Sequence, residues 1–439
     1  MLFIVYLHLT IYNTMETSNS NSKIQFKIGM VAPSGSGKTS LISSVCSEVQ
    51  DRLASEPSLE FWPEGTATQR AMQRANAEFN TAINNPNNLF QVPKLQPTSS
   101  ISEYQFAVTL PTTKQTIGFS VLDYPGHLLG TSEFSSKVTP HLLESAALFV
   151  PISADILMYW GQTNGLTGTY NTQCNAAANM LLDCDNVILA IKNWIAEKRK
   201  VEASAQLFFV PIKCEKYFDD NGGRVDSHQK LYEAILERYI KPLEMTKNEE
   251  QLIQTNIFFV DTYGVVELRN IEAVMAKDKD NYEQLTLVPT FMRRMDQGKK
   301  RRTKNAYELL MSILKFQVEN RFKEQQIETS DLSSENEKTK IEIEKRKKRR
   351  DVAINNVEKR KNSYGFWASL WYTFFNDDEL DRLEEEALKA DNDVKETEKK
   401  FQSIFDKYKL SAQQCESLEK AVRTLTDLFN NMYNRQYTI

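Results

Sequence analysis

Apolar positions alternate with polar or small ones from Ile24 to Met30, which is the two-residue period of a strand. The next apolar positions, Leu41, Ile42 and Val45, follow the spacing of a helix. A glycine-rich turn that ends in a lysine and a threonine separates the two patterns. The sequence therefore predicts a strand, a loop and a helix near the start of the chain.

Strand and helix patterns continue to alternate over the next two hundred residues. Strands are predicted at Tyr104–Leu110, Thr116–Leu122, Ala146–Ser153, Gln206–Ile212 and Asn256–Val260, helices at 71–83, Ala176–Lys198 and Ser227–Ile240, and a loop rich in glycine and asparagine at Tyr159–Thr172. Such alternation predicts an α/β fold in which a mostly parallel sheet is flanked by helices.

The composition changes from about Thr303, where glycine and proline nearly vanish and charged residues dominate. Between Leu380 and Met432, apolar or small residues recur at alternating steps of three and four, with polar interruptions at Thr397 and Ser411. This pattern predicts a coiled-coil helix of about 80 Å, at 1.5 Å per residue. The arm before it, 307–362, is less regular but also helical, so we expect an antiparallel helical hairpin.

Between the two arms lies the aromatic tip, 364–375, which holds the densest run of aromatic residues in the chain. It follows the basic run Lys345–Arg350, which by itself is typical of a solvated helix face. Aromatic and basic residues together suit the surface of an anionic membrane. A protein partner or internal packing would cover the same side chains, and all three readings stay open.

The chain has 439 residues, which is too long for one compact domain of ordinary size. We expect a disordered or mis-assigned N-terminus at 1–22, a domain at 23–295 and the hairpin at 300–439. A net charge of −4 gives no case for specific nucleic-acid binding. The five cysteines show no paired spacing, which predicts a reducing, cytoplasmic environment.

The first twelve residues are apolar but too few to span a bilayer, and they lack the features of a signal peptide. We interpret residues 1–14 as a start-site artefact or a disordered tail. A short segment that touches a membrane is the alternative, so peripheral membrane association stays open.

The first loop, Ala32–Thr39, has the residue types of a phosphate-binding loop. Glycines turn backbone N–H groups toward an anion, the following helix adds its positive end, lysine reaches the β- and γ-phosphates, and a threonine hydroxyl ligates Mg²⁺. Ala32 replaces the first glycine of the usual pattern. The predicted nucleotide contacts here are Ser34, Gly35, Ser36, Gly37, Lys38, Thr39 and Ser40.

A second motif follows the strand that ends at Asp123. Ligands of open α/β sheets bind at the carboxyl ends of the strands, so Asp123 is placed to hold Mg²⁺. The N–H of Gly126 is a candidate partner of the γ-phosphate. Thr98 lies in a loop before the strand pair, with Ser99 or Ser100 as substitutes. This position resembles that of the threonine by which GTPases sense the γ-phosphate through Mg²⁺, and the resemblance implies that Thr98 is a third Mg²⁺ ligand.

Asp123-Tyr-Pro-Gly126-His127 resembles the Asp-x-Pro-Gly-His motif of translation-factor-like TRAFAC GTPases. The resemblance implies a P-loop GTPase in which His127 orients the attacking water. The long insertion before Thr98 is similar to that of the bacterial double-GTPase type. The hairpin loosely resembles the stalks of dynamin-type GTPases.

The base is predicted from Lys213 and Glu215, which follow a strand where such GTPases carry an Asn/Thr-Lys-x-Asp motif. The resemblance implies that Lys213 covers the base and that Glu215 accepts hydrogen bonds from guanine. Ile212 in place of Asn or Thr, and glutamate in place of aspartate, depart from the motif. These residues favour GTP, with ATP as the alternative.

The sequence thus predicts a slow, Mg²⁺-dependent GTPase switch whose nucleotide state controls the hairpin. One alternative is a dynamin-like protein that remodels membranes and forms homodimers or larger oligomers through the hairpin. A P-loop ATPase is the other.

Overall fold

The computed structural model describes residues 24–55, 59–88, 91–92, 98–215, 227–249, 251–277, 283–294, 303, 305–363 and 378–437. The predicted N-terminal region, 1–22, and the aromatic tip lie outside these ranges. The chain forms two compact units, Met1–Val318 with Ala421–Ile439, and Glu319–Lys420. The domain limits at 295 and 300 stay a prediction; the first turns of the helix that starts at Ala306 belong to the first unit.

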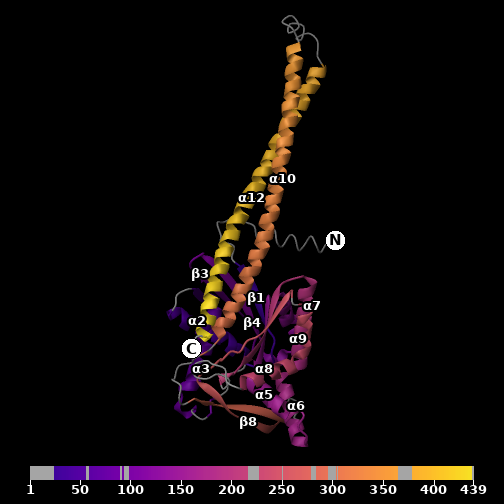
Figure 1. The fold of residues 1–439 in the computed structure, drawn as a ribbon. Helices are drawn as coiled ribbons and strands as arrows, with labels where there is room; N and C mark the ends of the chain where they lie inside the picture. The colour runs from indigo at the N-terminus through magenta and orange to yellow at the C-terminus, as the bar shows by residue number, and fades with distance from the viewer. Residues whose placement is uncertain are drawn as a thin grey trace. The chain divides into compact units, whose positions relative to one another are not determined.

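A seven-stranded sheet forms the centre of the first unit, in the order β2-β3-β4-β1-β5-β6-β7 (Figure 1). Its strands are β1 Ile24–Met30, β2 Glu60–Glu64, β3 Ser102–Leu110, β4 Gln115–Asp123, β5 Ala147–Ser153, β6 Ala205–Ile212 and β7 Ile253–Ile257. The pairs from β4 to β7 are parallel, whereas β2, β3 and β4 pair antiparallel. The predicted α/β class with a mostly parallel sheet is confirmed.

Helices and short helical turns join these strands. They are α2 Lys38–Ser55, α3 Gly65–Asn84, η1 Pro86–Asn88, η2 Gly126–Leu128, η3 Phe134–Val138, α4 Thr139–Glu144, α5 Ala154–Thr163, α6 Thr169–Leu182, α7 Cys184–Lys200, α8 Ser227–Arg238 and α9 Ile240–Lys247.

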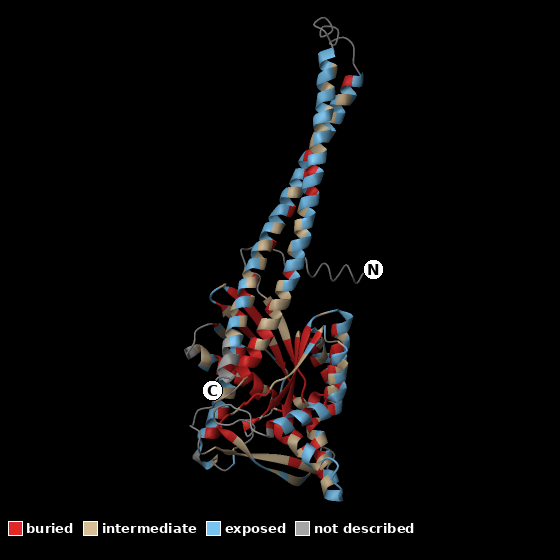
Figure 2. Ribbon diagram, viewed as in Figure 1, coloured by how far each residue is buried: buried red, intermediate tan, exposed pale blue. Residues whose placement is uncertain are grey.

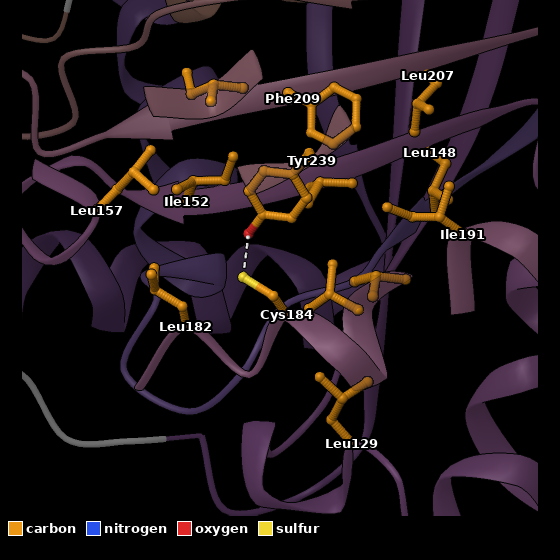
Figure 3. Packing of buried hydrophobic residues seen from close by; sticks show 14 of the residues in the cluster. Leu129, Leu148, Ile152, Leu157, Leu182, Cys184, Ile191, Leu207, Phe209 and Tyr239 are labelled. Carbon is orange, nitrogen blue, oxygen red and sulfur yellow. Dashed lines mark hydrogen bonds between the residues drawn. The ribbon is translucent and has the colours of Figure 1, made fainter. Parts of the chain in front are cut away.

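Alternate residues of the central strands face opposite sides of the sheet, as the pleat requires. Leu148 and Ile152 of β5 lie on one side, in a cluster with Phe209 of β6 and Ile191 of α7 (Figure 3). Phe149 of β5 lies on the other side, near α2 and the first turns of the helix that starts at Ala306. The central strands are therefore buried on both faces (Figure 2).

Three predictions of local structure were wrong. The predicted loop Tyr159–Thr172 contains the end of α5 and the start of α6, because Leu157 and Trp160 of α5 are buried at helical spacing. The single helix predicted at 176–198 is two helices, since Asp183 adopts the left-handed conformation with φ 44° and separates α6 from α7. The seventh strand lies three residues earlier than predicted, at Ile253–Ile257.

Three strands were missed by the sequence patterns. One is the edge strand β2, which contains a proline. The other two, β8 Val266–Lys277 and β9 Glu283–Arg293, form an antiparallel hairpin outside the main sheet. The N–H of Val92 donates to the carbonyl of Phe291 at 2.8 Å, which ties β9 to the segment that precedes Thr98 in sequence.

The second unit is made of two helices, α10 Ala306–Ser363 and α12 Asp378–Tyr437, in their parts between Glu319 and Lys420. The predicted seam of α12 is buried at Val394, Ile404 and Leu418. Polar seam position Ser411 accepts a hydrogen bond from the Gln325 side chain of α10 at 2.8 Å. The pairing confirms the predicted helix pair. None of the described helices is long and apolar enough to cross a membrane.

Candidate functional site

The loop between β1 and α2 has the backbone that its glycines permit. Gly35 and Gly37 have φ angles of 73° and 99°, a region that favours glycine. A Cβ on Gly37 would lie 2.5 Å from Cδ1 of Ile212 at the end of β6. Ile212, a departure from the expected motif, therefore packs directly under the loop.

Lys38 begins α2 and folds back over the loop. Its Nζ donates to the carbonyls of Ala32 at 2.8 Å and Pro33 at 3.0 Å, and it lies 4.7 Å from the centre of the Tyr124 ring. Burial lowers the pKa of Lys38 to about 8, although the nearby Asp123 charge opposes this change. The lysine is thus held beside the loop amides, where an anion would bind.

Tyr124 is a site residue that the sequence patterns missed. Its side chain is fully buried, and its hydroxyl accepts a hydrogen bond from the N–H of Ala32 at 3.2 Å. The ring supports Lys38 on one face. The motif was recognised from the spacing between Asp123 and Gly126, and this spacing says nothing about the side chain between them.

Three of the predicted Mg²⁺ ligands meet at one point. The Thr39 hydroxyl donates to Oδ2 of Asp123 at 2.6 Å, Thr98 donates to the same oxygen at 3.1 Å, and the two threonine hydroxyls are 2.7 Å apart. The residues come from α2, the segment before β3, and the end of β4. Sequence positions separated by up to 84 residues are therefore brought together.

The chemistry of this cluster fits a hard cation. Asp123 is buried, and within the described residues its Oδ1 has no hydrogen-bond partner. Burial raises the pKa of Asp123, against the hydrogen bonds from the two threonines. No group of three or more His, Cys, Asp or Glu side chains that could hold a metal forms among the described residues. One carboxylate with hydroxyls suits Mg²⁺, which takes most of its ligands from water and phosphate.

Gly126 lies directly against the loop. A Cβ there would be 2.2 Å from the backbone nitrogen of Ser34 and 2.4 Å from the carbonyl carbon of Pro33. The neighbouring His127 is exposed on η2 and does not line the cavity described next. Its role in orienting water stays a prediction.

A cavity of about 430 Å³ opens in front of the loop. Every loop residue predicted to bind a nucleotide lines it, together with Thr98, Gly126 and Lys213. Asp123 lies behind Thr39 and Thr98 rather than on the wall. Most of the remaining lining is apolar or aromatic, including Phe79 of α3 and Phe291 of β9, and Ser43, Glu78 and Ser153 add polar side chains.

Ser40 and Lys213, which both line this wall, are each held by a neighbouring residue. The Ser40 hydroxyl is 2.9 Å from the Tyr263 hydroxyl, and the Tyr263 ring stacks on Phe79 at 4.9 Å between centroids. Lys213 donates from Nζ to the carbonyl of Gly35 at 3.2 Å. Lys213 therefore connects the end of β6 to the loop.

Glu215 does not reach the cavity. Its side chain is 4% exposed, and burial raises its pKa well above the ordinary value, helped by the neighbouring carboxylates of Asp261 and Asp155. In this conformation Glu215 is not placed to read a base, and its predicted role stays a prediction.

No family model matches the chain, and no curated protein matches it. Similar solved structures include a chain of the signal recognition particle receptor SRb-GTP/SRX complex from Chaetomium thermophilum, at 13% identity and TM-score 0.28, covering 54% of this chain and 91% of that one. The GTP-bound Ski7 GTPase-like domain of S. cerevisiae gives 11% and 0.29, with coverage of 55% and 44%. GDP-bound sup35 gives 9% and 0.24, with 56% and 40%.

The chain spans less than half of the Ski7 and sup35 chains, and TM-scores of this size do not assign a function. The class instead follows from the chain itself. A parallel sheet carries a glycine-rich loop between β1 and α2, with the lysine and threonine at the helix start and an aspartate at the end of β4. These features define a P-loop fold with a candidate nucleotide site.

Proposed function

We propose that this protein is a P-loop GTPase switch. The observation that carries the proposal is the meeting of Thr39, Thr98 and Asp123 around one carboxylate oxygen beside the loop. A passive phosphate-binding loop needs none of these distant partners. A triphosphate hydrolase that uses Mg²⁺ needs them at this point.

The loop and Lys38 supply the binding of the phosphates. The amides of the loop and the start of α2 form a positive pocket, and the lysine adds a full charge next to it. Lys38 now donates to two loop carbonyls, so a bound phosphate would replace these contacts with a stronger, charge-assisted bond.

Thr39, Thr98 and Asp123 would hold Mg²⁺. The bound ion would neutralise charge on the β- and γ-phosphates. The residues around it position the substrate, because their hydroxyls and carboxylate are already within hydrogen-bond distance of one another. Little rearrangement of the protein is then needed when the ion binds.

Thr98 and Gly126 would sense the third phosphate of the nucleotide. Thr98 lies on the segment that precedes β3, and Gly126 starts the turn η2 after β4. Each lies against the loop or α2, so both segments would gain contacts to a bound γ-phosphate and lose these contacts after hydrolysis, as in GTPase switches. Hydrolysis by His127 would require η2 to move, because the imidazole is outside the cavity wall.

Competition binding between GTP and ATP tests which base the site accepts. GTP is proposed because Lys213 matches the lysine of the base motif in the GTPases that Asp123 to His127 resembles, and its Nζ donates to the Gly35 carbonyl of the loop. Equal affinity for GTP and ATP in the full-length protein would remove the guanine assignment and leave the P-loop site intact.

Replacing Lys38 with alanine tests the whole site. We expect GTP affinity to fall by about 10- to 150-fold, because a hydrogen bond to a charged group is lost. Titration calorimetry of the full chain with a non-hydrolysable GTP analogue measures this loss. A Lys38→Ala protein that binds and hydrolyses GTP like the wild type would refute the proposed function.

Replacing Asp123 with asparagine separates Mg²⁺ binding from folding. Asparagine keeps an acceptor for Thr39 and Thr98 but removes a charge whose burial is unfavourable. We expect a higher melting temperature without ligands and at least about a tenfold weaker Mg²⁺ dependence of GTP binding. Thermal-shift measurements with and without Mg²⁺ test both expectations, the higher melting temperature and the weaker response to Mg²⁺. An unchanged Mg²⁺ response would show that Asp123 is not a ligand.

A further inference from the structure

The β8–β9 hairpin forms part of the same cavity as the phosphate loop. Val266 of β8 and Leu287, Pro289 and Phe291 of β9 line it, although these strands form a separate sheet. The hairpin lies within the first unit, as the loop does. The two ends of the cavity therefore differ: one is the loop of amides and hydroxyls, and the other is largely apolar.

Phe291 is the aromatic residue by which β9 lines the cavity, and it lies next to Lys213. The Nζ of Lys213 lies 5.4 Å from the centre of its ring, and the same nitrogen donates to the Gly35 carbonyl at 3.2 Å. Lys213 follows the carboxyl end of β6, and its backbone adopts the left-handed conformation with φ 60°. The ring thus lies beside the residue that marks the base end of the site.

The flat apolar face of the Phe291 ring suits a stacked base. Glu215, the acceptor expected from sequence, is buried away from the cavity. Aromatic side chains bind bases of any identity by stacking, because every base has a π-face. The ammonium of Lys213 now covers this ring face by a cation–π contact, which a stacked base would replace.

We propose that Phe291 stacks on the purine base of the bound nucleotide, so that the β8–β9 hairpin completes the nucleotide site. This inference rests on the proposed function, since it needs a nucleotide on the loop. It assigns base binding to β9, which lies outside the sheet that carries the phosphate loop.

The experiment compares two ligands that share phosphates but differ in the base. GTP and inorganic tripolyphosphate are titrated calorimetrically into the full-length protein, as wild type, Phe291→Leu and Phe291→Tyr. Leucine keeps apolar bulk without a flat ring, and tyrosine keeps the ring. The backbone bond from Val92 to the residue 291 carbonyl is available to all three. Met275→Ala, on an exposed position of β8 outside the cavity wall, is the matched control.

Phe291→Leu is expected to bind GTP about 5- to 150-fold more weakly and tripolyphosphate with unchanged affinity. Phe291→Tyr and Met275→Ala should match the wild type with both ligands. Unchanged GTP binding by Phe291→Leu, or an equal loss for both ligands, would overturn the stacking assignment while the proposed function stands. A wild type that binds neither ligand would refute the proposed function and this inference with it.

A second measurement does not depend on the stability of the leucine variant. In Phe291→Trp, a stacked base should quench the new tryptophan fluorescence on addition of GTP but not of tripolyphosphate. The wild-type protein, with its five native tryptophans, gives the background signal. Equal responses to the two ligands after this correction would contradict a base on the ring.

Discussion

Gly126→Ala is expected to lower the free energy of unfolding by about 3 kcal/mol, at the upper end of the range for overpacking. The added Cβ would lie 2.2 Å from the nitrogen of Ser34 and 2.4 Å from the carbonyl carbon of Pro33. Both atoms belong to backbone, so no side chain can rotate away. Either η2 or the phosphate loop must move, and chemical denaturation of the full-length protein measures the cost.

The same substitution should remove the preference for triphosphate over diphosphate if Gly126 contacts the γ-phosphate. Gly161→Ala in α5 is the matched control, because a Cβ there meets nothing within 4 Å and alanine favours a helix by about 1 kcal/mol. We expect Gly161→Ala to leave stability and nucleotide binding unchanged or slightly improved. A Gly126→Ala protein as stable as the wild type would show that the two loops are not held together as described.

The sequence predicted best those parts of the site that are formed by residues close together in the chain. Gly35, Gly37 and Lys38 lie within four residues, so their spacing alone defines the loop. Asp123 followed from its place at the end of an apolar strand. The structure places Thr98 against both Thr39 and Asp123, although only its position in a loop had pointed to it.

What sequence could not predict depends on packing between distant segments. Glu215 stands where a base reader was expected, but its burial against Asp261 follows from the fold beyond β7. The residues of β8 and β9 are mostly half-buried. These strands therefore lack the strict alternation of apolar and polar residues that marks a strand with one solvent-exposed face. Ala32 departs from the usual glycine, and its partner, the Tyr124 hydroxyl, lies 92 residues away.

Glu48→Ala is expected to destabilise the first unit by about 2 to 5 kcal/mol, because it leaves two buried N–H groups without their acceptor. Oε2 of Glu48 accepts from the N–H of Ala306 at 2.8 Å and that of Tyr307 at 3.3 Å, at the start of α10. Glu48 is on α2, the helix that begins with Lys38, so it joins the nucleotide site to α10. Glu48→Gln keeps an acceptor oxygen and should retain most of this stability.

The charge of Glu48 gives the contact a pH dependence. Burial and the neighbouring Glu308 raise the pKa of Glu48 to about 8, although Arg52, which binds Glu308 at 2.9 Å, opposes the shift. The folded chain therefore keeps a proton that the unfolded chain releases above its ordinary pKa of 4.5. The contribution of Glu48 to the free energy of unfolding should fall as pH rises from about 4.5 to about 8 and then level off.

Glu48→Gln should make this fall smaller than in the wild type, because the glutamine side chain does not titrate. Denaturation between pH 5 and 9 measures the slopes of the two proteins. If Glu48→Gln kept the wild-type slope, another group would be the source of the pH dependence.

Hydrogen exchange at Ala306 and Tyr307 tests the contact between Glu48 and the start of α10 directly. The exchange of these two N–H groups should be faster in Glu48→Ala than in Glu48→Gln. Because α2 begins in the phosphate loop, the Glu48 contact, together with the ion pair between Arg52 and Glu308, connects the nucleotide site to the start of α10.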